Sequence, residues 1–167
     1  VYMLQWAAPE RRFTGVDYDE EKITVAQHNQ FNNACIDFEQ ADLSHYVLKS
    51  CDGIIINDVL HYLLPEEQER LLERCYAALN ENGVLIIRDG VSELQDRLKG
   101  TKRTEFWSTR LLKYNKTKNP LHYISREAIQ DFAHRHDMTI KVLDTSKYTA
   151  NLIFVLRKQA VNAINLP

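Results

Sequence analysis

Short apolar runs alternate with amphipathic stretches along the first 90 residues. The runs "RFTGVD" (12–17), "GIIIND" (53–58) and "VLIIRD" (84–89) are each brief and end in an acid. An apolar run of this length between polar residues is typical of a buried strand. The pattern therefore predicts three buried strands, and the weaker run "CIDF" (35–38) predicts a fourth between the first two.

Helical signals separate these strands. Residues 1–8 have the pattern of a helix end that Pro9 terminates, and Asp19 is placed to cap a second helix. A third helix is expected to begin at Pro65 and to end at Asn82-Gly83. Its apolar stripe has helical spacing and consists of Leu72, Cys75, Tyr76 and Leu79.

The last third of the chain has a different order of elements. Ser125 can cap a helix, with Ile124 and Ile129 in the positions of a hydrophobic staple. The runs "MTIKVLD" (138–144) and "ANLIFVLRK" (150–158) follow and are close enough to pair antiparallel at a sheet edge. The whole pattern predicts an α/β fold: a mostly parallel sheet flanked by helices, with a C-terminal antiparallel strand pair.

The composition is that of an ordinary globular domain. Among 167 residues, 44% are hydrophobic and 26% charged, and the net charge is -2, so there is no global attraction to nucleic acid. The most apolar stretch, "GIIINDVLHYLL", is interrupted by polar side chains, and no transmembrane segment is expected. The scattered residues Cys35, Cys51 and Cys75 are expected to be buried reduced thiols of a cytoplasmic protein.

Polar side chains follow the ends of the predicted strands. Ligands of open α/β sheets bind beyond these carboxyl ends, which makes Asp17, Asp42 and Asn57 candidate ligand contacts. Asp17 can accept hydrogen bonds from both hydroxyl groups of a ribose. The alternative is structural, with Asp17 favoured near a helix N-terminus and Asp42 capping a short helix. Asp58 is expected to act as a cap or to stabilise a loop.

Several segments of the chain resemble the class I S-adenosylmethionine-dependent methyltransferases. They are "GVDYDEEKITVAQHN", "QADL", the block "DGIIINDVLHYLLPEEQERLLERCYAALNENGVLIIRD" and the closing strand pair. Dinucleotide-binding domains share the acid after the second strand, whereas the long block and the antiparallel pair are more specific. The resemblance covers residues 1–158 and implies a Rossmann-like methyltransferase domain. Residues 159–167 form a tail without an assignment.

The resemblance implies a site for S-adenosylmethionine. Asp17 matches the acid that holds the ribose hydroxyls, and Tyr18 matches a neighbour that packs on the adenine. Asp42 matches the side chain that meets the adenine amino group, with Leu43 beside it. Asn57 matches a position near the methionine part of the cofactor.

A candidate catalytic base, His61, follows the third predicted strand. Methyl transfer depends on near-attack geometry, and a hydroxyl or amine acceptor can also need a general base. His61 matches the base of small-molecule O-methyltransferases, but packing explains a histidine there equally well. No metal site is expected, because the spacing of His134 and His136 points them to different faces of a helix.

The first strand of the family and its glycine-rich loop should precede "VYMLQWAAP". That loop cradles the methionine end of the cofactor, and its strand lies at the sheet centre, so without it two neighbouring strands expose unpaired edges. We therefore expect upstream residues in the intact protein, and expect the chain from Val1 alone not to be a competent enzyme. Fusion to upstream lipid-export or acyltransferase domains would fit such a start.

Residues 101–118 are basic and aromatic, with six Lys or Arg and one Glu. Insertions at this place in the family often cover the acceptor site, where Phe106, Trp107 and Tyr114 could form a wall. The basic residues would then attract an anionic or lipid-like acceptor. The alternative is a solvated amphipathic helix with its aromatic face on the core. Nucleic acid is not favoured, because the basic excess is short and local.

The resemblance as a whole implies methyl transfer from S-adenosylmethionine to a small-molecule or lipid-like acceptor in the cytoplasm. A non-catalytic cofactor-binding or scaffold module of the same fold is the alternative. A nicotinamide-dependent oxidoreductase is disfavoured by the antiparallel pair and by the absence of a second catalytic domain.

Overall fold

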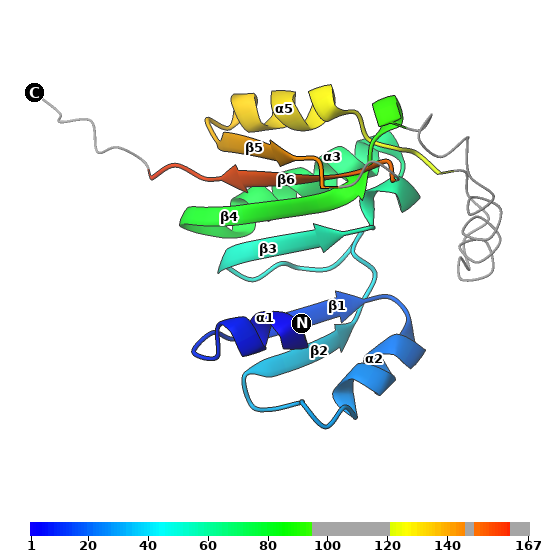
Figure 1. Cartoon of the computed structure of the whole chain (residues 1–167), viewed down its shortest axis with the longest axis vertical. Helices are drawn as coiled ribbons and strands as arrows, with labels where there is room; N and C mark the ends of the chain where they lie inside the picture. Colours follow the sequence, from blue (N-terminus) through cyan, green and yellow to red (C-terminus); the bar gives the residue numbers. More distant parts are fainter. Residues whose placement is uncertain (95–120, 146–148, 161–167) are drawn as a thin grey trace, which may run out of the picture. The chain divides into compact units, whose positions relative to one another are not determined.

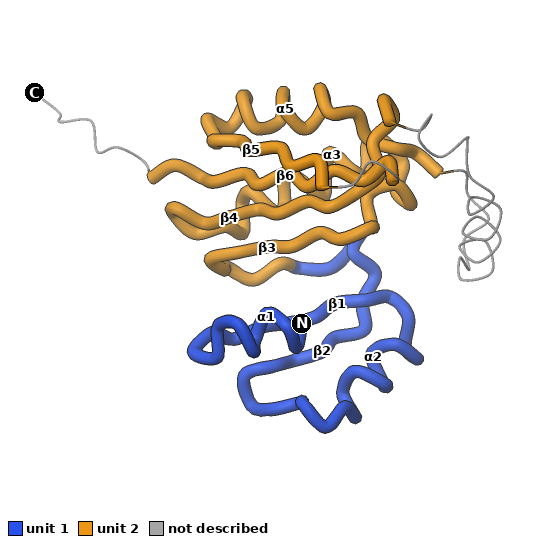
Figure 2. Tube along the Cα trace, viewed as in Figure 1, with its two compact units in different colours: residues 1–47 blue, residues 48–167 orange. Residues whose placement is uncertain are grey.

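The computed structural model describes residues 1–94, 121–145 and 149–160, in two compact units, residues 1–47 and 48–167 (Figure 2). The basic segment 101–118 and most of the tail 159–167 lie outside the described residues. Among the helices that the structure describes, none has the length and apolar character needed to cross a membrane.

Unit 1 is a pair of parallel strands with two short helices (Figure 1). Its elements in chain order are α1 (Tyr2–Ala7), β1 (Phe13–Asp17), α2 (Glu20–Gln27) and β2 (Ile36–Gln40). Asp17 pairs with Gln40, so both strands end at the same edge. Asp19 caps α2 as predicted, because its side chain accepts a hydrogen bond from the Glu21 N–H at 3.0 Å.

Unit 2 contains a four-stranded mixed sheet in the order β3-β4-β6-β5 (Figure 1). Its elements are β3 (Cys51–Asn57), the 3-10 turn η1 (Leu60–Tyr62), α3 (Pro65–Ala78), β4 (Leu79–Gly90), α5 (Arg126–Arg135), β5 (Thr139–Leu143) and β6 (Asn151–Arg157). β3 and β4 are parallel, and β6 is antiparallel to both β4 and β5, which confirms the predicted C-terminal pair. Among the described residues, β1, β2, β3 and β5 each pair with one strand only, and β1 and β3 are the two that the sequence predicts to have unpaired edges.

Buried and less buried side chains alternate along β4 and β6, so one face of the unit 2 sheet packs on the core. Leu85 and Ile87 of β4 pair with Leu156 and Phe154 of β6, and all four side chains are fully buried. Helices α3 and α5 contribute to the same apolar cluster, so they cover this face. Burying one such side chain stabilises the fold by about 1.5–3 kcal/mol. Burial also raises the pKa of the Cys75 thiol, on α3, to about 12.

The end of α3 differs from the prediction. The helix begins at Pro65 as expected but ends at Ala78, before the Asn82-Gly83 signal. Leu79 is already extended, with ψ at 129°, and pairs with Cys51, so its assignment to the helical stripe was wrong. The left-handed φ of Asn82 (62°) therefore lies within β4 and is not a helix cap. Lys158 satisfies this helix end instead, donating from Nζ to the Leu79 carbonyl oxygen at 2.8 Å.

Candidate active site

The carboxyl edge of unit 1 gathers four of the predicted cofactor residues. Asp17 ends β1 and Tyr18 follows it, while Asp42 and Leu43 come shortly after β2. The Ala41 N–H donates to the Asp17 carbonyl oxygen at 3.1 Å, which keeps the two outgoing segments side by side. The structure thus places these residues at one sheet edge, and their role in cofactor binding stays a prediction.

The two carboxylate oxygens of Asp17 have different partners, a backbone N–H for one and an exposed ion pair for the other. Its Oδ1 accepts a hydrogen bond from the Asp19 N–H at 3.0 Å, a structural role at the start of α2. Its Oδ2 lies 3.6 Å from Lys22 Nζ, and the Asp17 side chain is 39% exposed. An exposed ion pair of this length is weak, so Oδ2 can exchange it for a ligand hydroxyl.

Asp42 opens a turn and not the short helix that its structural alternative required. The Asp42 Oδ1 accepts from the Ser44 N–H at 2.8 Å and also from the Ser44 hydroxyl. These hydrogen bonds, the hydroxyl first, hold the pKa of Asp42 below its ordinary value of 3.8. Asp42 is therefore an ionised acceptor at neutral pH, and its side chain is 64% exposed.

Asn57 and Asp58 follow β3 in unit 2. The exposed Asn57 amide donates from Nδ2 to Asp58 Oδ2 at 3.1 Å. Asp58 has a left-handed φ of 54° and accepts hydrogen bonds from Arg88 of β4 and from Asn151 of β6. It ties the end of β3 to two other strands, which confirms the predicted loop-stabilising role.

The imidazole of His61 is buried against a carboxylate. His61 is 7% exposed, and its Nδ1 lies 2.5 Å from Oδ1 of the fully buried Asp89. The other oxygen, Oδ2, accepts from the N–H groups of Val59 at 3.0 Å and Leu60 at 2.7 Å. An ionised carboxylate only accepts hydrogen bonds, so beside an ionised Asp89 the donor of this bond is Nδ1, and Nε2 is the ring nitrogen that is left to accept a proton. The arrangement suits a general base whose protonated form the carboxylate stabilises.

Backbone contacts fix the turn that carries His61. The buried amide of Gln68, on α3, donates from Nε2 to the carbonyl oxygens of Leu60 at 3.0 Å, Leu63 at 3.2 Å and His122 at 2.6 Å. The His122 N–H in turn donates to the His61 carbonyl oxygen at 2.9 Å. The turn η1 is thus joined to α3 and to the segment that precedes α5.

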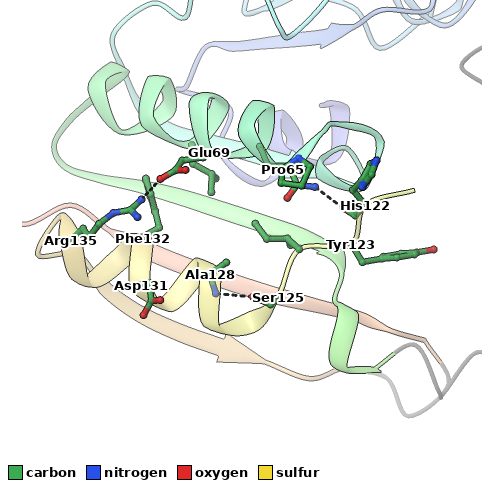
Figure 3. A pocket seen from close by; sticks show the side chains of 12 residues that line it. Pro65, Glu69, His122, Tyr123, Ser125, Ala128, Asp131, Phe132 and Arg135 are labelled. Atoms are coloured by element: carbon green, nitrogen blue, oxygen red, sulfur yellow. Dashed lines mark hydrogen bonds and ion pairs between the residues drawn. The ribbon is translucent and has the colours of Figure 1, made fainter. Parts of the chain in front are cut away.

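A cavity of about 450 Å³ lies between α3 and α5 (Figure 3). Gln68 and Glu69 from α3 line it, with Phe132 and Arg135 from α5, and Arg135 Nη2 donates to Glu69 Oε1 at 2.9 Å. The buried Nε2 of His122, which also lines the cavity, has no partner among the described residues. None of the six predicted site residues lines this cavity, although Gln68 and His122, which hold the turn of His61, do.

Sequence reasoning missed Asp89 and Gln68. Asp89 was available from the same signal that singled out Asp17, an acid that terminates a buried apolar run. Gln68 had no such signal, because α3 contains many polar residues and only the tertiary fold shows which one is buried.

Solved structures that share this fold are methyltransferases. An O-methyltransferase family protein from Burkholderia thailandensis matches with a TM-score of 0.71 at 13% identity, over 96% of this chain and 47% of that chain. The N-methyltransferase NodS from Bradyrhizobium japonicum, solved with S-adenosyl-l-homocysteine, matches with a TM-score of 0.66 at 15% identity, over 94% and 72%. At these identities the likeness shows the fold, which is Rossmann-like as predicted.

Sequence comparison assigns the family. A carboxy-S-adenosyl-L-methionine synthase from Helicobacter hepaticus is 35% identical over 88 residues, 52% of this chain and 37% of that protein. The chain thus matches about a third of the length of such curated relatives. The model of the methyltransferase domain family matches residues 2–85, just over half of the 167 residues. The chain belongs to this family, which confirms the class predicted from the sequence.

Proposed function

We propose that this protein transfers a methyl group from S-adenosylmethionine to a hydroxyl or amine of a small-molecule or lipid-like acceptor. The observation that supports it best is the buried His61–Asp89 pair in a chain of the methyltransferase domain family. The carboxylate engages Nδ1, so Nε2 is the ring nitrogen of His61 that can take a proton from the acceptor.

Residues at the carboxyl edge of unit 1 fit the nucleoside part of this cofactor. Asp17 Oδ2 and the ionised Asp42 are acceptors for hydroxyl and amino groups, and Tyr18 and Leu43 offer apolar surface beside them. Asn57 is assigned to the methionine part through the family resemblance. When bound, S-adenosylmethionine supplies an electrophilic methyl group on its sulfonium.

His61 would act by accepting the proton of the acceptor at Nε2, while Asp89 stabilises the resulting imidazolium. The hydrogen bonds of Gln68 and His122 hold the turn in place before reaction, so little reorganisation is needed. A positioned general base typically contributes about 10²–10⁴-fold to the rate.

Calorimetric titration of S-adenosylmethionine and S-adenosylhomocysteine into the full-length protein tests the cofactor assignment. Asp17→Ala should weaken binding tenfold or more, about 1.4 kcal/mol. Asp37→Ala removes an exposed acid within β2 and should leave the affinity unchanged. Absence of binding by the folded full-length protein would overturn the enzyme proposal and leave a scaffold module.

Substitution of His61 tests the base. His61→Gln should lower kcat about a hundredfold or more with unchanged cofactor affinity, and added imidazole should partly restore His61→Ala. The matched control is His134→Gln, at an exposed histidine of α5. Turnover by His61→Gln at the wild-type rate would show that His61 serves packing alone.

A related transfer is the second candidate, favoured by the 35% identity to a carboxy-S-adenosyl-L-methionine synthase. In that case a carboxylated donor molecule would transfer its carboxyl group to the S-methyl carbon of the cofactor, which loses a proton, and no acceptor would be methylated. Mass spectrometry of the cofactor and the acceptor after turnover distinguishes methyl transfer from carboxyl transfer. Rates measured with matched anionic and neutral acceptors test whether the enzyme prefers a negatively charged acceptor.

A further inference from the structure

The aromatic ring of Tyr123 lies beside the imidazole of His61. The two ring centroids are 5.7 Å apart and the planes differ by 20°, an offset stack. The backbone on both sides of Tyr123 is fixed close to the site. His122 donates to the His61 carbonyl oxygen at 2.9 Å, and the Ile124 carbonyl oxygen accepts from the Ser92 N–H at 3.1 Å. The ring position is therefore defined by the fold.

Gly90 follows Asp89 directly and leaves the space that this ring occupies. A Cβ at residue 90 would come within 2.8 and 2.9 Å of two carbons of the Tyr123 ring, closer than van der Waals contact permits. Its φ is not positive, so backbone conformation does not require glycine here. Glycine is required at residue 90 because the Tyr123 ring approaches the backbone so closely.

The hydrogen bond to Asp89 alone does not determine the plane of the His61 ring. A single bond at Nδ1 fixes one direction, and the imidazole can still swing about it and move Nε2. Two aromatic rings flank the imidazole. Tyr62 is tilted by 50° at a centroid distance of 4.1 Å, whereas the ring of Tyr123 is nearly parallel to the imidazole, and a parallel face of this kind removes the remaining freedom. Tyr123 is half-buried, and burial first, then the charge of Asp89, raises the pKa of its hydroxyl, so the neutral ring persists at neutral pH.

We propose that Tyr123 is a positioning residue for His61, holding Nε2 in one orientation toward the acceptor, and that Gly90 is required because Tyr123 packs there. The catalytic consequence rests on the proposed function of His61. The positioning itself is a property of the folded chain and can be measured without turnover.

The test separates the Tyr123 ring from its hydroxyl and from general packing. In the full-length protein, Tyr123→Leu keeps an apolar side chain but removes the flat face, and kcat should fall tenfold or more while cofactor affinity holds. Tyr123→Phe restores the face and should recover most of this loss. If kcat of Tyr123→Phe is as low as that of Tyr123→Leu, the hydroxyl is the functional group and the proposal that the ring positions His61 is overturned.

Gly90→Ala perturbs the same contact from the other side. It should lower kcat by a similar factor, because the new methyl group displaces the ring. In the double variant with Tyr123→Leu the second change should add little, since no ring remains to be displaced. Fully additive losses would show that Gly90 acts independently of Tyr123 and would contradict the proposal.

The ¹⁵N signals of the His61 imidazole give a readout that is independent of activity. The folded protein should show one Nδ1-protonated tautomer held by Asp89. Tyr123→Leu should keep this tautomer but shift and broaden the Nε2 signal, because the imidazole loses its stacking partner and samples more than one orientation. The matched control is Tyr76→Leu, because Tyr76 contacts His136 with centroids 4.1 Å apart. Unchanged His61 signals in a folded Tyr123→Leu would overturn the positioning role. Shifted signals without methyl transfer in any variant would overturn the proposed function alone.

Discussion

Unit 1 and unit 2 differ in how deeply their candidate residues are buried and in how many hydrogen bonds hold them. In unit 1, whose residues 1–47 are all described, the only buried residues are Ile23 and Ile36, and the side chains of Asp17 and Asp42 are 39% and 64% exposed. In unit 2, which has a continuous apolar core, the fully buried carboxylate of Asp89 accepts four hydrogen bonds, from His61 Nδ1 and from the N–H groups of Val59, Leu60 and Gly90. Solvated acids can contact a ligand with little support, whereas a buried charge persists only where donors surround it.

Removing the carboxylate of Asp89 should have the largest effect. Asp89→Ala leaves the N–H groups of Val59 and Leu60 and the imidazole Nδ1 of His61 without their acceptor in a buried site. The free energy of unfolding should fall by about 3 kcal/mol, measured by urea denaturation.

The control for this loss is the same substitution at an exposed acid of α5. Asp131→Ala should change the free energy of unfolding by no more than about 0.5 kcal/mol. A loss below about 1 kcal/mol for Asp89→Ala would mean that water replaces the carboxylate, and the contrast between the units would weaken.

Hydrogen exchange should show the same contrast without any substitution. Amides of Ile87 and Phe154, in the paired central strands β4 and β6, should exchange at least about a hundredfold more slowly than those of Val16 and Phe38 in unit 1. Two parallel strands with two buried side chains have little to resist local opening. Equal protection would show that unit 1 opens only when unit 2 does.

Gln68 offers a smaller perturbation of unit 2. Gln68→Leu fills the same space but removes the Gln68 donor from the carbonyl oxygens of Leu63 and His122, while that of Leu60 keeps the Leu63 N–H. The free energy of unfolding, measured by urea denaturation, should fall by about 2 kcal/mol. Gln130→Leu makes the same change at an exposed position of α5 and should be nearly neutral. Similar losses for both would show that the amide adds nothing beyond its volume.

The sequence predicts the elements far better than their ends and their buried polar contacts. The apolar runs at 53–58 and 84–89 and the cap Ser125 are local signals, and each appears in the structure as expected. Ile124 and Ile129, predicted as a staple, are both buried in the apolar cluster. The predicted end of α3 was wrong because strand pairing at Leu79 outweighed the local Asn82-Gly83 signal. The partnership of His61 with Asp89 joins positions 28 residues apart, so only the fold reveals it.

The smallest effect is expected in unit 1, at Asp42. Hydrogen bonds from Ser44 lower the pKa of Asp42, so they stabilise the folded state above the ordinary value of 3.8 and lose that contribution as pH falls through the folded pKa. Ser44→Ala should raise the pKa of Asp42 toward its ordinary value, measured by NMR titration. Because the Asp42 side chain is 64% exposed, the loss of stability at pH 7 should not exceed about 0.5 kcal/mol. Ser50→Ala, at an exposed serine, should leave the Asp42 titration unchanged. A loss in Ser44→Ala as large as that of Asp89→Ala would mean that unit 1 depends on its polar edge as strongly as unit 2 depends on its buried pair.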